Sequence, residues 1–202
     1  MSNPDSRDIE TSKKWFDKGL AYANLKNYKK AIVCYDKATK LNPKYDSAWY
    51  NKGLDYDELK NYDKAIECYD KVTEIDAKKK NAWFQKGLAY HHLVNYKKAI
   101  ACYDKATEIE PNDSDTWTEK GLSYHYLKNY KQAITCYDKA TEIDAKNENA
   151  WFNKGLAYYN LKNYKKAISC YDKATKIDPK YDGSWFYKGL ANGKFKNCLL
   201  YT

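Results

Sequence analysis

The sequence predicts an all-α fold in which short antiparallel helices stack into a solenoid. All six tryptophans lie 34 residues apart, so one unit occurs five times and begins a sixth time: Trp15, Trp49, Trp83, Trp117, Trp151 and Trp185. A unit of this length cannot bury its own apolar face, and neighbouring copies must stack to form a continuous core. Apolar residues make up 43% of the 202 residues, which is enough to fill such a core.

Each repeat contains two helices, because its apolar residues follow helical spacing on both sides of a polar turn. In the first repeat the spacing of 4, 3 and 3 residues occurs twice, first in Trp15, Gly19, Tyr22 and Leu25, then in Ala31, Tyr35, Ala38 and Leu41. Each set forms one stripe along a helix. The two stripes predict a pair of helices that pack against each other.

The turns of the repeat have their own signals. Asn27 and its equivalents stand between the two helices, where asparagine can cap the second helix or accept a left-handed backbone. The second helix is expected to end before Pro43, Pro111 and Pro179, since proline cannot continue a helix. The repeat is therefore helix, turn, helix and loop.

This pattern resembles the tetratricopeptide repeat (TPR) family over residues 12–202. The family pattern of Trp, Gly, Tyr, Ala, an aromatic residue, Ala and Pro is matched in the first repeat by Trp15, Gly19, Tyr22, Ala31, Tyr35, Ala38 and Pro43. The resemblance implies a right-handed TPR α-solenoid of antiparallel helix pairs, with five complete repeats and a sixth first helix. We expect an N-terminal lead-in at 1–11 and one array at 12–202, with repeats 12–45, 46–79, 80–113, 114–147, 148–181 and a partial repeat 182–202.

The sequence departs from the family pattern in three columns. Lys18 and its equivalents replace a leucine, Val72 replaces the second alanine, and Ala77 and Ala145 replace the proline. The lysine stem is expected to lie on apolar surface while its ammonium group reaches water. These changes bear on the geometry of the turns rather than on the fold.

The cysteines indicate a reducing compartment. Five of the six recur at one place in each repeat: Cys34, Cys68, Cys102, Cys136 and Cys170. Stacked helices lie about 8–10 Å apart, whereas a disulfide needs Cα atoms within about 7 Å, so we expect free thiols that act as small packing residues. The first eleven residues contain no apolar run and no segment reaches the length of a membrane span. We expect a cytoplasmic protein.

The resemblance implies that the first helices line a concave groove, with six columns around each tryptophan facing it. Its aromatic floor includes Tyr50 and Phe84, for which half-buried packing between helices is the favoured interpretation. The walls vary between repeats, and variation in exposed columns is where a partner would be recognised. The candidate partner-binding residues are Tyr50, Asn51, Asp57, Glu58, Phe84, Gln85, His91, His92, Asp115, Glu119, His125, Tyr126, Asn153 and Tyr159.

Charge narrows the choice of partner. The chain has a formal net charge of +9, yet the predicted groove columns hold two lysines and five carboxylates. A peptide or protein segment with basic and apolar residues is therefore the expected ligand. The basic residues are lysines apart from Arg7 and are scattered, so nucleic-acid binding is a weak alternative. Asp57, His91 and His125 share a column that could ligate zinc or nickel, but local ligand spacing is lacking and no metal is expected.

The sequence contains no phosphate-binding loop, His-Glu-x-x-His motif or nucleophile elbow, so we expect no enzymatic activity and no cofactor. The predicted function is a non-enzymatic scaffold or adaptor that binds a protein segment in its groove. The alternative is a self-associating array that binds through its ends. The sixth first helix carries Trp185, Phe186 and Leu190 without room for a second helix, which predicts weak homo-association through the C-terminal end or a piece of a longer array.

Overall fold

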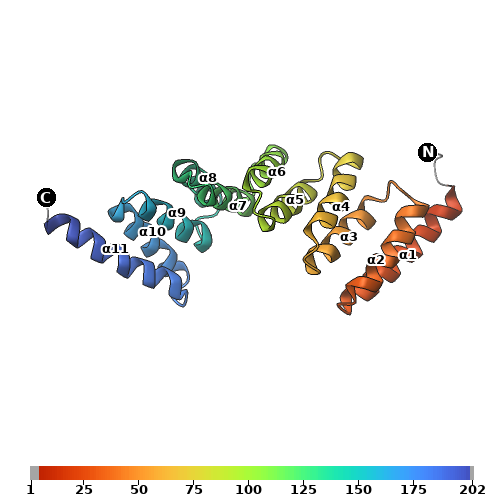
Figure 1. Cartoon of the computed structure of the whole chain (residues 1–202), viewed down its shortest axis with the longest axis horizontal. Coiled ribbons are helices and arrows are strands. Elements are labelled where there is room, and N and C mark those ends of the chain that lie inside the picture. The colour runs from red at the N-terminus through yellow and green to blue at the C-terminus, as the bar shows by residue number, and fades with distance from the viewer. Residues whose placement is uncertain (1–4, 201–202) are drawn as a thin grey trace. The chain divides into compact units, whose positions relative to one another are not determined.

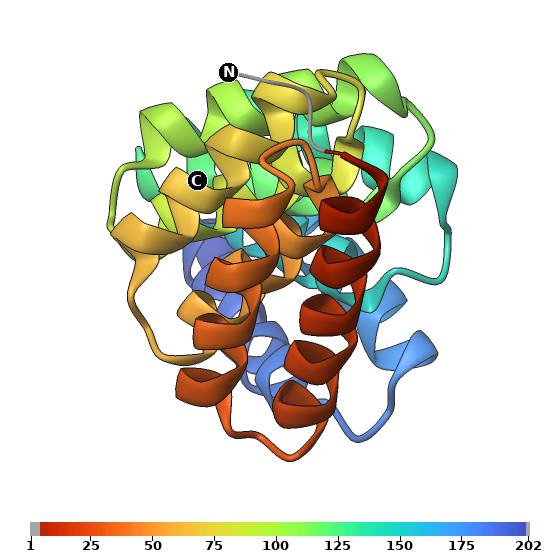
Figure 2. The same cartoon turned by 90° about the vertical axis from the view of Figure 1, so that its right-hand side faces the viewer.

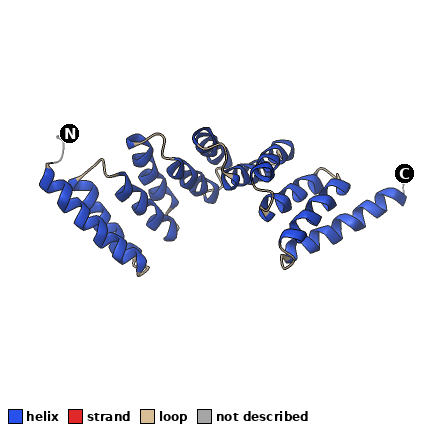
Figure 3. Cartoon of the chain, turned by 180° about the vertical axis from the view of Figure 1, so that it is seen from behind, coloured by secondary structure: helices blue, strands red, loops and turns tan. Residues whose placement is uncertain are grey.

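The predicted all-α fold is confirmed. The structure, a computed structural model, describes residues 5–200, with side chains to 196, and within that range it contains eleven helices and no strand (Figures 1 and 3). The helices are α1 (Ser6–Asn24), α2 (Tyr28–Leu41), α3 (Asp46–Glu58), α4 (Tyr62–Ile75), α5 (Lys80–His92), α6 (Tyr96–Ile109), α7 (Ser114–Tyr126), α8 (Tyr130–Ile143), α9 (Glu148–Asn160), α10 (Tyr164–Ile177) and α11 (Asp182–Leu200). They form two compact units that divide within α6, after Lys105.

Within each unit the helices pack in chain order. In the first unit α1 packs on α2, and α2, α3, α4 and α5 continue the series. Figure 2 shows α1 and α2 side by side as an antiparallel pair. In the second unit α7 to α11 follow the same order. Helices α2, α4, α8 and α10 therefore each lie between their own first helix and the first helix of the next repeat, as stacked repeats require.

The centre of each repeat is a tyrosine of the second helix. Tyr35, Tyr69 and Tyr171 have no exposed surface, and each ring lies directly against the glycine of its own first helix. The tryptophans are half-buried, apart from the exposed Trp185. From Trp49 onward, the indole Nε1 donates to the carbonyl oxygen six residues earlier in the loop between repeats, as in Trp49 to Pro43 at 3.0 Å and Trp83 to Ala77 at 3.0 Å. Replacing proline by alanine thus leaves this loop contact unchanged.

In the turn between the two helices, two adjacent residues have separate roles. Asn27 caps α2, since its side-chain oxygen accepts from the backbone N–H of Lys30 at 3.4 Å. The capping prediction is confirmed, but the left-handed backbone belongs to the residue before it, with φ between 57° and 59° at Lys26, Lys60, Val94, Lys128 and Lys162. The asparagine is needed as the cap and cannot serve both roles.

The prediction that the ammonium groups of the Lys18 column reach water is wrong for Lys52, Lys86, Lys154 and Lys188. Lys52 pairs with Asp36 of the preceding second helix at 2.6 Å and only 12% of its side chain is exposed. The same pair recurs between Lys154 and Asp138 at 2.6 Å, and between Lys86 and Asp70, Lys188 and Asp172. The leucine of the family pattern is thus replaced by an ion pair between neighbouring repeats.

The five repeated cysteines are free and buried, as predicted. Burial raises the pKa of Cys68 to about 12 and that of Cys102 and Cys170 to about 11. Thiols held neutral in this way are poor nucleophiles. They act as small packing residues of the second helices.

Candidate functional site

Four of the predicted groove residues of the first unit surround one pocket. Asp57 and Glu58 form the last turn of α3, and Gln85 and His92 come from α5, one repeat later. The pocket has a volume of about 290 Å³, and its lining is completed by Lys60, Tyr62 and Leu88. Stacking of α5 against α4, which packs on α3, brings these residues together. The site combines two carboxylates with an amide and an aromatic wall.

Asp57 is the half-buried carboxylate of this pocket. One of its carboxylate oxygens accepts from the Tyr69 hydroxyl, and the other has no hydrogen-bond partner in the structure. Burial raises the pKa of Asp57 to about 6, the Tyr69 hydrogen bond opposes that rise, and the nearby Glu58 carboxylate adds to it. At neutral pH the carboxyl group is mostly ionised, and it gains its proton just below that range.

The aromatic floor of the first unit packs inside its own repeats. Tyr50 lies 6.0 Å from Tyr69 and Phe84 lies 6.0 Å from Tyr103, measured between ring centroids. Both floor side chains are half-buried. Packing between helices therefore accounts for these rings, and each leaves one part of its surface exposed.

The neighbouring candidates of the first unit have separate surroundings. His92 stacks on Tyr62 with ring centroids 4.7 Å apart and lines the pocket, whereas His91 meets Tyr96 edge-on at 5.0 Å. Burial lowers the pKa of His91, with a contribution from His92. Asn51 donates to the Ser47 carbonyl of its own helix at 2.8 Å. Of these three residues, the structure brings only His92 to the pocket.

The remaining candidates belong to the second unit. Glu119 on α7 is half-buried, and burial, with Asp115 as a second cause, raises its pKa. His125 lies 3.3 Å from the Asn160 amide and 5.1 Å from the Tyr130 ring, and burial lowers its pKa. Further candidates of this unit are Tyr126, which is 54% exposed, and the half-buried Asn153 and Tyr159.

One column that links successive first helices was not recognised from the sequence. It lies four residues before each tryptophan and contains Tyr45, Lys79, Asn147 and Tyr181. Tyr45 packs on Phe16 at 5.0 Å, and Lys79 pairs with Asp46 at 2.8 Å. The Asn147 amide donates to Ser114 at 2.7 Å. Its variation between repeats gave no clear signal, because the next column varies as much: Ser12, Asp46, Lys80, Ser114, Glu148 and Asp182.

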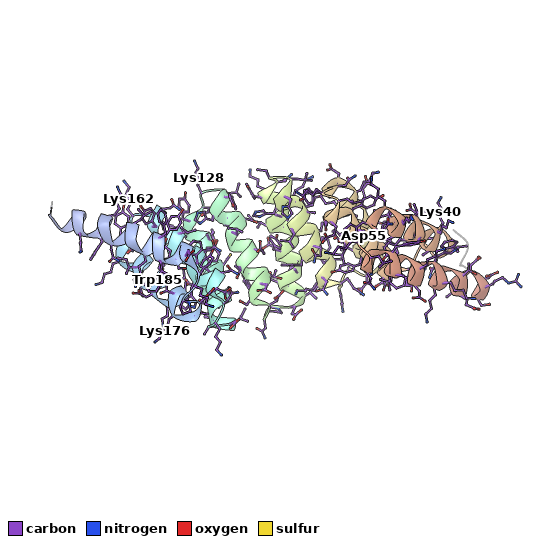
Figure 4. The ribbon with its side chains drawn as sticks, turned by 90° about the horizontal axis from the view of Figure 1, so that it is seen from below. Lys40, Asp55, Lys128, Lys162, Lys176 and Trp185 are labelled. Atoms are coloured by element: carbon purple, nitrogen blue, oxygen red, sulfur yellow. The ribbon has the colours of Figure 1, made fainter. Side chains whose placement is uncertain are left out.

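A second residue missed by the sequence analysis is Asp55. It occupies a column that contains Ala89 and Ala157 in other repeats, and it is 4% exposed. One carboxylate oxygen has no hydrogen-bond partner, nor does the buried hydroxyl of Tyr35. Burial raises the pKa of Asp55 to about 7, and Glu58 adds to the rise. Figure 4 shows Asp55 among the helices of its unit, whereas Lys128, Lys162 and Lys176 lie at the periphery of theirs.

The last described helix exposes apolar side chains. Trp185 is 49%, Phe186 62% and Leu190 41% exposed. Helix α11 continues to Leu200, so the segment 195–200 does not fold back over the face that carries these residues. Tyr201 and Thr202 lie outside the described residues.

Two further findings concern the described part of the chain. It holds no group of three or more His, Cys, Asp or Glu residues arranged to bind a metal ion. None of its helices combines the length and the apolar character needed to cross a membrane.

Comparison with known proteins identifies the repeat. A tetratricopeptide repeat model matches residues 12–45, 47–78, 81–113 and 148–181, and two further models of such repeats match residues 102–135 and 121–162. No curated protein sequence matches the chain at a significant level.

Solved structures of similar fold include other TPR solenoids. A MamA protein is 24% identical, with a TM-score of 0.80 over 85% of this chain and 93% of that chain. YrrB, described as a TPR protein with an unusual peptide-binding site, is 22% identical, with a TM-score of 0.76 over 87% and 90%. MamA from Desulfovibrio magneticus RS-1 is 17% identical, with a TM-score of 0.79 over 85% and 97%. These likenesses confirm the predicted α-solenoid fold, and the repeat models cover most of the sequence. The chain belongs to the tetratricopeptide repeat family.

Proposed function

We propose that the chain is a non-enzymatic, cytoplasmic scaffold or adaptor that binds a segment of another protein, with the pocket of Asp57, Glu58, Gln85 and His92 as its principal contact. The observation that carries this proposal is the pairing of two carboxylates with an aromatic wall in a pocket of about 290 Å³. The likeness to YrrB, described as a TPR protein with an unusual peptide-binding site, is consistent with it. Tyr50 and Phe84 offer partly exposed rings on the same first helices.

The charge of this pocket selects the ligand. Asp57 is half-buried, and its oxygen without a hydrogen-bond partner is covered by protein atoms, whereas Glu58 is exposed beside it. A lysine or arginine next to an apolar residue fits this pocket, because the cation meets Glu58 near the charge of Asp57 and the apolar residue meets the rings. An acidic segment would meet the like charge of Asp57 and Glu58, with Lys60 as a cation of the same lining.

A binding experiment tests this specificity. Two labelled peptides share one apolar anchor, flanked by lysines in the first and by glutamates in the second, and their affinities are measured at low and moderate salt. The lysine peptide is expected to bind tighter, and Asp57→Asn to weaken it about tenfold through loss of a nearby negative charge. The asparagine can still accept from Tyr69. Asp63→Asn, an exposed change on α4, is the matched control.

The same experiment has a pH dependence. Affinity for the lysine peptide should rise between pH 5 and pH 7, because Asp57, whose pKa is about 6, becomes charged over that interval. His91, whose pKa burial lowers, becomes neutral as pH rises and acts in the same direction. The rise should be smaller in Asp57→Asn. Tighter binding of the glutamate peptide, or an unchanged affinity in Asp57→Asn, would contradict the proposal.

A second candidate function, homo-association, rests on the exposed surface of α11. Trp185, Phe186 and Leu190 together present apolar side chains to solvent, which favours contact with another apolar surface. We expect light scattering to show an average mass that increases with protein concentration, and Phe186→Glu to remove the increase. Leu127→Glu, at a site 40% exposed at the end of α7, serves as the control. A strict monomer at high concentration would rule this candidate out.

A further inference from the structure

The ion pairs between repeats show what packs against the outer face of a first helix. In the first unit, Asp36 of α2 pairs with Lys52 of α3 at 2.6 Å, and the same ammonium lies 4.7 Å from the centroid of the Trp49 ring. The charge of Asp36 also contributes to the raised pKa values of Tyr56 and Cys68. The Asp36 carboxylate therefore lies beside a group of four residues from the next repeat: Trp49, Lys52, Tyr56 and Cys68.

Helices α1 and α2 present the same four residue types, and no described helix packs against the surface that they form. Figure 2 looks directly onto this pair. Trp15, Lys18 and Tyr22 of α1 line a pocket of about 400 Å³ together with Cys34 of α2. Lys18 is exposed and has no carboxylate partner among the described residues, in contrast to Lys52.

The pocket differs from its equivalent in the next repeat in charge. Its remaining lining residues are Lys29, Lys30, Val33 and Lys37, so it holds four ammonium groups and no carboxylate. In the following helix pair, Asp63 and Glu67 occupy the positions of Lys29 and Val33. Val33 is 54% exposed and adds apolar surface at this position. A partner for this pocket must be acidic and partly apolar.

We propose that this pocket binds an acidic amphipathic helix of another protein. The helix places an Asp or Glu carboxylate against Lys18 and packs apolar side chains on Trp15, Tyr22 and Val33. In doing so it takes the position that a preceding second helix takes in the other repeats. This surface is separate from the groove pocket of Asp57, and it selects the opposite charge.

A second copy of the chain is a poorer occupant than another protein. Four of its second helices already use their pairing aspartate within the chain, because Asp36, Asp70, Asp138 and Asp172 each pair with a lysine of the following repeat. Docking one of these helices on the pocket would break an existing ion pair. A partner whose carboxylate is free forms the contact without that loss.

The test uses a helical peptide taken from the chain itself. A fluorescent, lactam-bridged peptide with the sequence of residues 61–76 carries Asp70 in the pairing column, and its binding is followed by anisotropy at low salt. We expect the peptide to bind and its Asp70→Asn form to bind at least tenfold more weakly. In the full chain, Lys18→Gln should reduce affinity at least tenfold, whereas Lys18→Arg should retain it. Lys40→Gln, an exposed change near the end of α2, should leave it unchanged.

Three results would overturn the proposal. The first is equal affinity for the native peptide and its Asp70→Asn form. The second is unchanged affinity in Lys18→Gln while circular dichroism shows the native helix content and melting temperature. The third is a dimer in sedimentation that the peptide dissociates and Lys18→Gln abolishes, since the pocket would then belong to a second copy. None of these readouts involves Asp57, so the groove proposal stands or fails independently.

Discussion

Replacing Gly155 by alanine is expected to lower the free energy of unfolding by about 3 kcal/mol, a large loss for one added methyl group. A Cβ at this position would lie 2.5 Å from Cε1 of Tyr171. The tyrosine has no exposed surface and is enclosed by neighbouring helices, so its ring has no free space into which to move. Urea denaturation followed by circular dichroism measures the change.

Gly189 provides the matched control, because it occupies the same column in α11. Among the described residues, nothing lies within 4 Å of a Cβ added there. Gly189→Ala should therefore leave stability unchanged or raise it by up to about 1 kcal/mol through helix propensity. Equal losses in the two variants would show that the glycine column is required for the backbone of the first helix and not for close approach of the tyrosine.

Replacing Asp55 by alanine is expected to raise the free energy of unfolding by about 2–4 kcal/mol at pH 8, an unusual gain for a buried position. The residue is 4% exposed, and one carboxylate oxygen has no hydrogen-bond partner. Keeping it charged in the fold is costly, and the cost is the physical cause of its raised pKa. The native column accepts alanine at Ala89 and Ala157, both fully buried, so the smaller side chain fits.

The gain should depend on pH. Because the folded pKa of about 7 lies above the ordinary value of 3.8, the folded state binds the proton more tightly. Stability of the native chain should then fall as pH rises from about 4 to about 7 and level off above that. Asp55→Ala should flatten most of this slope, with a remainder from Asp57. Thermal unfolding from pH 4 to pH 8 measures both, with exposed Asp63→Ala as control. A variant less stable than the native chain at pH 8 would refute the account.

The fold could be predicted from the sequence because its determinants are periodic. Six tryptophans in register fix the length of the repeat, and the apolar stripes fix two helices per repeat. The contacts that depend on three dimensions could not be predicted in this way. Lys52 was expected to reach water, since the sequence shows its distance from Asp36 along the chain but not that α2 lies directly against α3.

The candidate site was predicted less completely. Column position selected Asp57, Glu58, Gln85 and His92, which line one pocket, because helical spacing places equivalent residues on one face. It could not separate His91 from His92, since adjacent residues on a helix point about 100° apart and the ring contacts of Tyr62 and Tyr96 decide which one faces the pocket. Asp55 was missed because one acidic residue in a column of alanines looks ordinary without knowledge of its burial.

The lysine and aspartate pairs between repeats have a consequence for how such a chain can change in length. The second repeat, for example, supplies Lys52 to the repeat before it and Asp70 to the repeat after it, as the pairs of Lys52 with Asp36 and Lys86 with Asp70 show. Gene duplication or deletion in steps of 34 residues therefore preserves interior pairs of this kind and leaves neither of their charges unmatched. A deletion that removes only one helix of a repeat would leave such a charge and would be strongly selected against. The ion pairs thus make the whole repeat the natural unit of evolutionary gain and loss.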